Sequence, residues 1–366
     1  MQCSATSSRA AAAATRGSAR AVGSSVRPFT RRPLRRSAAG AVVVRAATTA
    51  AEHVRYVNEV AVVPGKPPVE VLLKVLEAQG QAAVSPADRH GLHPLLIPLA
   101  QQPCGEGGSG SGELTCLLRW PEGHKGMELP VVSQARGGTQ VRLLARSLDE
   151  YLHRALAEAE ASGSSAAVAQ AAGSDAAELY QPGAVAASGL PSLDAYLTRK
   201  AGMFPDVAER LALAHLAKGD QMSALITGEW YMRNSHFPGW GRPYEFNSQL
   251  MARVGRAEEA RDVARLSLRL PWWSFADGFA AMRDTAEMSG GVAAIRQAME
   301  EQDEMSNMPG MKTVIKTEKQ QEMEEADWLM NTAAAGEASW DDIRSAVADR
   351  YADAGLREVA DFIRAA

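Results

Sequence analysis

The second half of the chain repeats one spacing of glycine and alanine, and this spacing constrains the fold more than any other feature. In three places a glycine ends a helix-like segment, and an alanine follows five residues later in the next segment. The three pairs are Gly219 and Ala224, Gly255 and Ala260, and Gly355 and Ala360. Glycine adopts the positive φ that ends many helices, and alanine lets two helices pack closely. The pattern therefore predicts helical hairpins over residues 190–366.

The distance between the first two glycines indicates a particular kind of hairpin. Gly219 and Gly255 are 36 residues apart, close to the 34-residue period of tetratricopeptide repeats. Tyr244 falls where such repeats carry a large aromatic residue, and Tyr351 precedes its glycine by four residues. The alternative is that the spacing recurs by chance in an alanine-rich helical domain. We expect an all-α, tetratricopeptide-like domain here.

Residues 52–160 show a different pattern, in which short strand-like and helix-like segments alternate. Apolar residues at helical spacing predict a helix over Pro67–Gln79, and Ser147 is a candidate N-cap for a helix over Leu148–Glu160. Gly137-Gly138 between two apolar runs is typical of a β-hairpin. The strand-like segments are Tyr56–Val63, Leu92–Leu99, Leu114–Trp120 and Val141–Arg146. Two prolines in the second of these favour an edge strand or an extended segment.

These patterns predict an α+β chain with a small N-terminal mixed α/β module followed by the helical domain. Residues 161–189 lie between the two and are rich in Ala, Gly and Ser, so we expect a flexible linker or insert there. The expected organisation is a cleaved, disordered transit peptide over 1–46, the module over 52–160, the linker over 161–189 and the helical domain over 190–366.

The first 51 residues contain nine arginines and no Asp, Glu or Lys. Organelle transit peptides have this Arg-rich, Ser-rich and acid-poor composition. Val44-Arg45-Ala46 resembles the end of algal stromal transit peptides, so we expect a chloroplast stromal protein. A mitochondrial presequence shares the composition, which keeps the mitochondrial matrix open as an alternative. A basic arm that binds nucleic acid or anionic lipid is the other interpretation of this segment.

Removal of residues 1–46 changes the charge of the chain. The full chain has 39 basic and 43 acidic residues, so the loss of nine arginines leaves 30 against 43, a net charge of −13. Nucleic-acid binding needs a basic surplus facing the phosphates, so it is disfavoured. No apolar run approaches the ~20 residues that span a bilayer. We expect a soluble chain that has no integral membrane segment and does not bind nucleic acid.

The sequence carries no clear catalytic, cofactor-binding or metal-binding motif, and we expect a protein that is not an enzyme. His90 and His93 lie close together but lack further ligands at suitable spacing, so a surface loop explains them better than a zinc site. Cys104 and Cys116 flank a Gly-rich run. They could form a regulatory disulfide, but unconnected thiols are the expectation in a reducing compartment.

Aromatic residues gather between Phe204 and Phe279, often beside Pro or Gly. Rigid turns that present Trp and Arg are typical of protein-binding hot spots. The alternative is that these rings fill the helical core. The candidate partner-binding residues are Trp230, Trp240, Arg242, Trp272 and Trp273.

Several segments in residues 51–280 resemble the green-lineage family called "in chloroplast ATPase biogenesis". The segments are Ala51–Gly80, Leu117–Val132, Leu143–Leu156, Met203–Arg233, Phe237–Arg256 and Ser267–Trp273. The resemblance fades after residue 280, and residues 105–112, 161–177 and 305–311 depart from it.

The resemblance implies a soluble stromal assembly factor, or chaperone, for the chloroplast ATP synthase. The implied client is the β subunit of the catalytic head before it joins α, with α/β or γ as further candidates. The resemblance implies no cofactor and carries no site residues. One alternative is a helical-repeat adaptor for another photosynthetic complex, and another is an enzyme built from scattered carboxylates and histidines.

Overall fold

The computed structural model describes residues 50–365, apart from 64, 66, 104–111, 175, 234 and 307–315. The described residues all belong to one compact unit. The predicted transit peptide and Cys104 lie outside the described residues.

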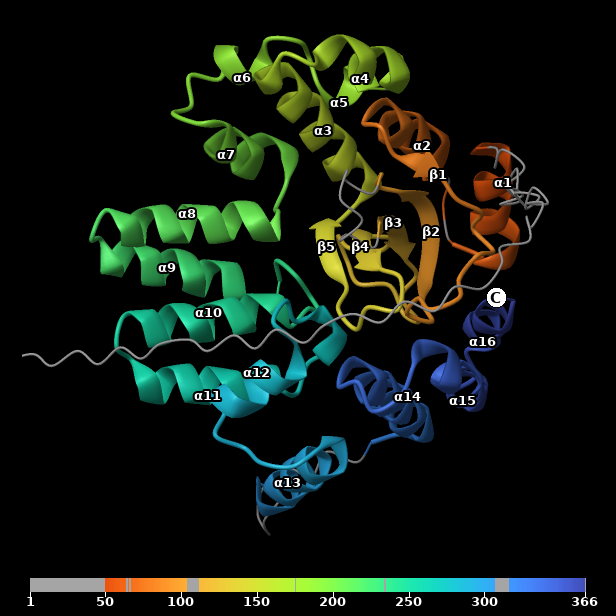
Figure 1. Ribbon diagram of the computed structural model, residues 1–366, viewed down its shortest axis with the longest axis vertical. Helices are drawn as coiled ribbons and strands as arrows, with labels where there is room; N and C mark the ends of the chain where they lie inside the picture. The colour runs from red at the N-terminus through yellow and green to blue at the C-terminus, as the bar shows by residue number, and fades with distance from the viewer. Residues whose placement is uncertain are drawn as a thin grey trace, which may run out of the picture. The chain divides into compact units, whose positions relative to one another are not determined.

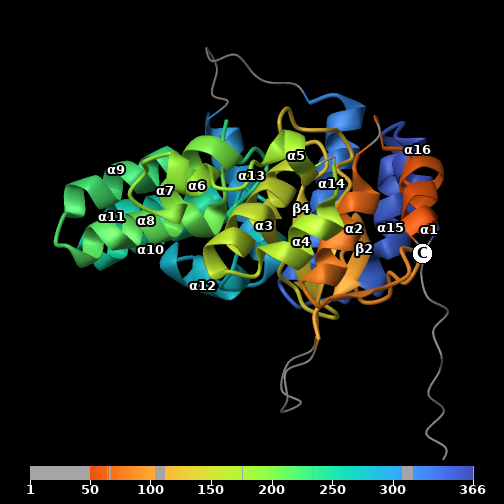
Figure 2. The same cartoon turned by 90° about the horizontal axis from the view of Figure 1, so that it is seen from above.

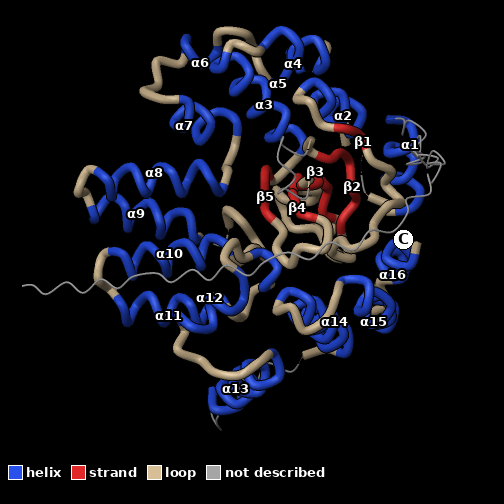
Figure 3. Tube along the Cα trace, viewed as in Figure 1, coloured by secondary structure: helices blue, strands red, loops and turns tan. Residues whose placement is uncertain are grey.

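The N-terminal module contains an antiparallel sheet. Within the described residues, five strands follow one another in the order β1-β2-β3-β4-β5, and Figure 3 shows strands only in this part of the chain. The bounds are β1 Ala82–Ala83, β2 Leu96–Gln101, β3 Glu113–Leu118, β4 Val131–Ala135 and β5 Arg142–Ala145. The predicted hairpin at Gly137-Gly138 is confirmed, since Gly137 has φ 75° between β4 and β5.

Helices surround this sheet (Figure 1). Ser147 caps α3 by accepting a 3.2 Å hydrogen bond from the backbone N–H of Glu150, as the sequence predicted. Helix α4 packs against α2 and α3, so part of the expected linker 161–189 has helical structure. The bounds are α1 Ala50–Arg55, a π-helical turn Tyr56–Val60, α2 Val69–Ala78, α3 Leu148–Ser162, α4 Ser165–Ala172, α5 Ala176–Leu179, α6 Ala184–Ala187 and α7 Leu193–Tyr196.

The rest of the described chain is helical. Helices α8 and α9 form one hairpin, and α10 and α11 form the next. The bounds are α8 Pro205–Ala217, α9 Gln221–Met232, α10 Arg242–Arg253 and α11 Ala257–Ser267; then a 3₁₀ turn Trp272–Ser274, α12 Gly278–Thr285, α13 Val292–Ser306, α14 Glu318–Ala334, α15 Trp340–Asp353 and α16 Arg357–Arg364. The predicted α+β class is confirmed.

The three repeated glycines end helices as the sequence predicted. Gly219, Gly255 and Gly355 have φ values of 79°, 85° and 79°. In each case the residue after the glycine donates its N–H to the carbonyl four residues before the glycine. This is the Schellman arrangement, which satisfies carbonyls at the end of a helix. The three paired alanines are all buried, so the second helix of each hairpin packs through a small residue.

Two predicted strands differ from the structure. The predicted strand Tyr56–Val63 is wrong: residues 50–60 form α1 and the π-helical turn. The buried residues there are His53, Tyr56, Val57 and Ala61, and their spacing of three to four residues fits a helical face rather than a strand.

The segment Leu92–Leu99 contributes to β2, which lies between β1 and β3 rather than at an edge. Pro98 is tolerated there because β1 pairs only with Ala100 and Gln101. Pro98 therefore lies beyond the end of the neighbouring strand, where its missing N–H removes no ladder bond on that side.

Candidate functional site

A cluster of aromatic rings joins the sheet to the helical hairpins. Trp273 lies 5.1 Å from Trp240 and 6.0 Å from Trp120, measured between ring centroids. The His93 ring lies between Trp273, at 4.6 Å, and Trp340, at 4.8 Å. We call these five rings the tryptophan cluster. Tilted and edge-to-face rings at such distances attract one another beyond the effect of their buried area.

Trp272, next to Trp273 in the chain, packs against helix α14 rather than against the tryptophan cluster. Its ring stacks on Phe279 at 4.1 Å and meets the edge of Trp328 at 5.7 Å. Its backbone N–H donates to Oδ1 of Asn331 at 2.9 Å, and its indole N–H donates to the carbonyl of Leu268 at 2.8 Å. The short turn that carries Trp272 and Trp273 therefore contacts both the sheet side and the C-terminal helices.

The five predicted partner-binding residues fall into two groups. Trp240, Trp272 and Trp273 have exposed fractions of 1%, 0% and 2%, so a partner cannot reach their rings in this structure. The sequence left core packing open as the alternative for these three residues, and in the structure their rings are packed in the core. Trp230 and Arg242 keep part of their surface, and whether they bind a partner stays a prediction.

Arg242 lies at the centre of a paired charge network. It donates two hydrogen bonds to the Glu209 carboxylate, at 2.8 and 2.7 Å, and one to Glu245 at 2.9 Å. The buried Glu245 also accepts from the backbone N–H groups of Ala276 and Asp277, at 2.6 and 2.8 Å. Burial raises the pKa of Glu245 despite the opposing charge of Arg242. The network fixes the start of α10 against the segment after the 3₁₀ turn.

A cleft of about 630 Å³ lies between one face of the sheet and helices α3, α8 and α10. Thr115 and Ser133 are cross-strand neighbours at its floor. Thr115 donates to the side chain of Gln81 at 2.9 Å, and Ser133 donates to Glu113 at 2.8 Å. Most covered sheet faces are apolar, so a polar floor on two central strands distinguishes this cleft.

The charged groups that line the cleft are paired with one another. Arg142 donates to Glu113 at 2.7 Å, and Arg154 donates two hydrogen bonds of 2.7 Å to Asp206 and one of 2.8 Å to Glu158. Burial alone would raise the pKa of Asp206. Hydrogen bonds and positive charges from Arg154 and from a second arginine, which also binds Asp206, lower this pKa instead. Asp206 therefore stays ionised and bound, and it is poorly suited to act as a base.

Outside the cleft, two large apolar side chains are well exposed on α9. Met222 and Ile226 are 68% and 58% exposed and lie one helical turn apart. Isolated exposed apolar residues are common on soluble proteins, and this pair alone identifies no partner. Among the described residues, no group of three or more His, Cys, Asp or Glu side chains is arranged to hold a metal ion. No helix in the described part is both long and apolar enough to cross a membrane.

Comparison with known protein families places three adjoining models along the chain. The PAB N-terminal model matches residues 51–200, the PAB middle domain matches 205–292 and the PAB C-terminal domain matches 295–366. The chain belongs to the PAB family. It is 35% identical over 342 residues to the Arabidopsis thaliana protein named "Protein IN CHLOROPLAST ATPASE BIOGENESIS, chloroplastic", covering 92% of this chain and 97% of that protein. No solved structure matches it.

The PAB segments meet at the features described above. The tryptophan cluster takes Trp120 and His93 from the N-terminal segment, Trp240 and Trp273 from the middle segment and Trp340 from the C-terminal segment. The cleft lies where the N-terminal and middle segments face each other. The resemblance to this family is confirmed, and it continues into the C-terminal third, where we expected it to fade.

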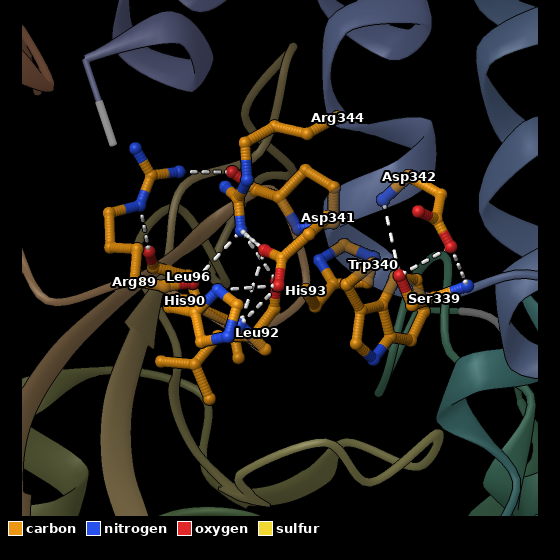
Figure 4. A network of polar contacts seen from close by, with 12 residues as sticks. Arg89, His90, Leu92, His93, Leu96, Ser339, Trp340, Asp341, Asp342 and Arg344 are labelled. Atoms are coloured by element: carbon orange, nitrogen blue, oxygen red, sulfur yellow. Dashed lines mark hydrogen bonds and ion pairs between the residues drawn. The ribbon is translucent and has the colours of Figure 1, made fainter.

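The PAB C-terminal segment returns to the N-terminal one through a dense polar network (Figure 4). Arg344 donates to the backbone carbonyls of Arg89 and Leu92, both at 2.9 Å. Asp341 accepts from the N–H of Gly91 at 3.0 Å and pairs with the His90 ring at 2.7 Å. Figure 2 shows α16 at the same end of the unit as α1, and the ring of Tyr56, in the turn after α1, lies 6.4 Å from the Phe362 ring of α16. The polar contacts hold α15 against the loop that precedes β2.

Arg89 adds a buried link to α16. Its guanidinium lies 3.9 Å from the centre of the Phe362 ring and donates to the Phe362 carbonyl at 2.6 Å. It also donates to the carbonyls of Leu96, at 2.9 Å, and Pro94. Burial lowers the pKa of Arg89 to about 10, so the group stays charged near neutral pH.

The structure corrects the expectation for one histidine of the pair. His93 is fully buried within the tryptophan cluster rather than in a surface loop, whereas His90 is exposed. Nδ1 of His93 accepts from the N–H of Leu95 at 3.3 Å, which requires a neutral ring. Burial, with the nearby Arg344 and Arg89 charges, lowers the pKa of His93 to about 3.

The sequence interpretation missed the cleft. A signal was present in β3, where Glu113 and Thr115 alternate with Leu114 and Cys116. Period-two alternation on a buried central strand indicates that one sheet face is polar. Cys116 lies on the apolar face, and burial raises the pKa of its thiol; its possible partner Cys104 is outside the described residues.

Proposed function

We propose that this chain is a non-catalytic assembly factor for the chloroplast ATP synthase that acts in the stroma. The observation that carries the proposal is the 35% identity to the Arabidopsis protein named for chloroplast ATPase biogenesis, over 92% of one chain and 97% of the other. Similarity across all three PAB segments supports a shared role rather than a shared module. The arginine-rich, acid-free start of the chain supports the same compartment.

The non-catalytic part of the proposal has support from the cleft. Its charged side chains are joined in ion pairs at 2.7 to 2.8 Å, so none of these is held ready for proton transfer or nucleophilic attack. A catalytic site commonly needs at least one group whose pKa is tuned and whose bonding capacity is free.

The client that we propose first is the β subunit of the catalytic head before it joins α. An unassembled β subunit exposes apolar interface, which is an aggregation hazard, and an assembly factor would cover that surface. Trp230 and Arg242 keep accessible surface and remain the proposed contact residues. Trp240, Trp272 and Trp273 would support this surface from within the core.

The test is quantitative mass spectrometry of the proteins that co-purify with the tagged chain from stroma. Enrichment of ATP synthase β over a tag-only control is the expected result. Predominant recovery of γ or of α/β would change the client within the same function. Recovery of another photosynthetic complex, with ATP synthase subunits at background, would favour the helical-repeat adaptor and overturn the proposal.

A further inference from the structure

The cleft between the sheet and α3, α8 and α10 offers two kinds of unused hydrogen-bonding group. The first kind is carboxamide side chains, because Gln79, Gln81, Gln102 and Gln140 all line the cleft. The carboxamide oxygens of Gln79 and Gln81 accept from Tyr151 and Thr115, at 3.2 and 2.9 Å. These two bonds leave both amide groups with donors to spare.

Gln102 and Gln140 have their whole carboxamide groups available for hydrogen bonding. Both are exposed, and neither side chain makes a hydrogen bond within the described part of the chain. A carboxamide carries an acceptor oxygen and an N–H donor, the same pair that a peptide group carries. Glutamines arranged around a cleft can therefore bond to the backbone of another chain, whatever its side chains are.

The second kind of unused group is the outer edge of β5. This strand is the last of the sheet, and its residues line the cleft. Val141, just before β5, donates its N–H to the carbonyl of Trp273 at 2.7 Å, so that end is occupied. Further along, Leu144 makes no backbone hydrogen bond to any other described segment on this outer side. An open sheet edge is a common docking place for an extended peptide.

The charged side chains that line the cleft favour a neutral ligand over a phosphorylated one. The lining contains the acids Glu113, Glu158, Asp206 and Glu209 and the bases Arg142, Arg154 and Arg242. The balance of four acids and three bases gives the lining a net charge of about −1, and all seven groups are already paired. A phosphorylated ligand would meet repulsion and would have to break these pairs. A neutral chain of amides would not.

We propose that this cleft binds an extended peptide segment of a client protein, recognised mainly through its backbone by the glutamine side chains and the edge of β5. The inference rests on the proposed function, because an assembly factor meets client chains whose segments are not yet buried in a complex. The volume of about 630 Å³ falls within the range of ~300–1,000 Å³ typical of ligand pockets, so a short segment fits.

The test uses the full chain and an array of overlapping peptides from the ATP synthase α, β and γ subunits and from unrelated stromal proteins. The best peptides are then labelled, and their affinity is measured by fluorescence anisotropy. Two variants fill the cleft from its rim, Gln102→Trp and Gln140→Trp. Gln297→Trp, on the exposed face of α13, is the matched control, and circular dichroism checks the fold of all three.

We expect at least a tenfold loss of affinity in each cleft variant and none in the control. Hydrogen exchange at Leu143 and Leu144 should slow when peptide binds the unmodified chain, a readout that needs no variant. Equal affinity in the cleft variants, or no peptide bound at all, would overturn the inference. A neutral small molecule from stroma that binds in the cleft while peptides do not would also overturn it.

The outcomes separate this inference from the proposed function. If unrelated peptides require the cleft and ATP synthase peptides do not bind, the peptide site stands and the proposed function fails. If the cleft variants still recover ATP synthase subunits from stroma as well as the unmodified chain does, the proposed function stands and the peptide site fails.

Discussion

At the scale of single residues, His93 shows how burial converts an ordinary side chain into a pH-dependent element of stability. Its pKa is about 3 in the folded chain, against 6.5 for an unperturbed histidine. Between these values the unfolded chain binds a proton that the folded chain does not. The free energy of unfolding therefore falls as the pH falls below about 6.5.

The difference in the pKa of His93 between the folded and unfolded chain makes the free energy of unfolding depend measurably on pH. Between pH 6.5 and 5.5 we expect His93 to contribute a loss of roughly 1 kcal/mol in the free energy of unfolding, since one pH unit corresponds to about 1.4 kcal/mol. His93→Gln should lack this part of the pH dependence, although it is less stable at pH 7.5. Urea unfolding of both chains at several pH values measures the difference. Parallel pH profiles would contradict the buried, neutral histidine.

At the scale of a helix, Gly228 occupies a position where the neighbouring helix leaves no room for a larger residue. A Cβ atom added at Gly228 would lie 2.6 Å from Oδ1 of Asn247 and 2.9 Å from Cδ2 of Leu250. Both neighbours are buried on α10, so they have little room to move. Gly228 therefore sets the distance between α9 and α10.

Alanine normally stabilises a helix by about 1 kcal/mol relative to glycine. We nevertheless expect Gly228→Ala to lower the free energy of unfolding by about 1–2 kcal/mol, because overpacking outweighs propensity. Glu229→Ala, next to it and exposed, should change stability by no more than about 0.5 kcal/mol. Denaturant unfolding of both variants checks this. A stabilised Gly228→Ala chain would show that α9 and α10 are farther apart than described.

Elements whose signals are local were predictable from the sequence. The glycine turns at Gly219, Gly255 and Gly355 depend on backbone conformation within a few residues, and the cap at Ser147 depends on a residue three positions away. The strand predicted at Tyr56–Val63 failed because a short apolar run does not separate helix from strand.

The candidate site was less predictable because its parts are distant in sequence. Trp272 and Trp273 follow a proline, where a turn is usually exposed. Their burial depends on His93 and Asn331, which lie far from them along the chain. Nothing near Pro271 in the sequence signals these contacts. The cleft likewise combines strands, α3 and two hairpins, and only the polar alternation in β3 pointed to it.

At the scale of the whole unit, the last PAB segment closes onto the first through a few buried polar groups. Arg89 donates to carbonyls of both its own segment and α16, and Trp340 donates its indole N–H to the Gly138 carbonyl at 2.8 Å. The three segments should therefore unfold together rather than one by one.

Arg89→Met tests this cooperativity. Loss of the guanidinium leaves buried carbonyls of Pro94, Leu96 and Phe362 without this donor, which should cost at least about 3 kcal/mol. Arg89→Lys should recover only part of the loss, because lysine lacks the planar set of donors. Hydrogen exchange should speed up in α16 and in β2 together. Faster exchange in α16 alone would indicate that the C-terminal segment is independently stable.

The central claim, that this chain assists ATP synthase assembly, is tested most directly in cells that lack it. Native gel electrophoresis with subunit-specific antibodies measures how much assembled catalytic head they contain, compared with cells in which the chain has been restored. We predict a several-fold decrease in assembled ATP synthase, with free subunits remaining and other photosynthetic complexes unchanged. Normal levels of the assembled enzyme in those cells would contradict the account.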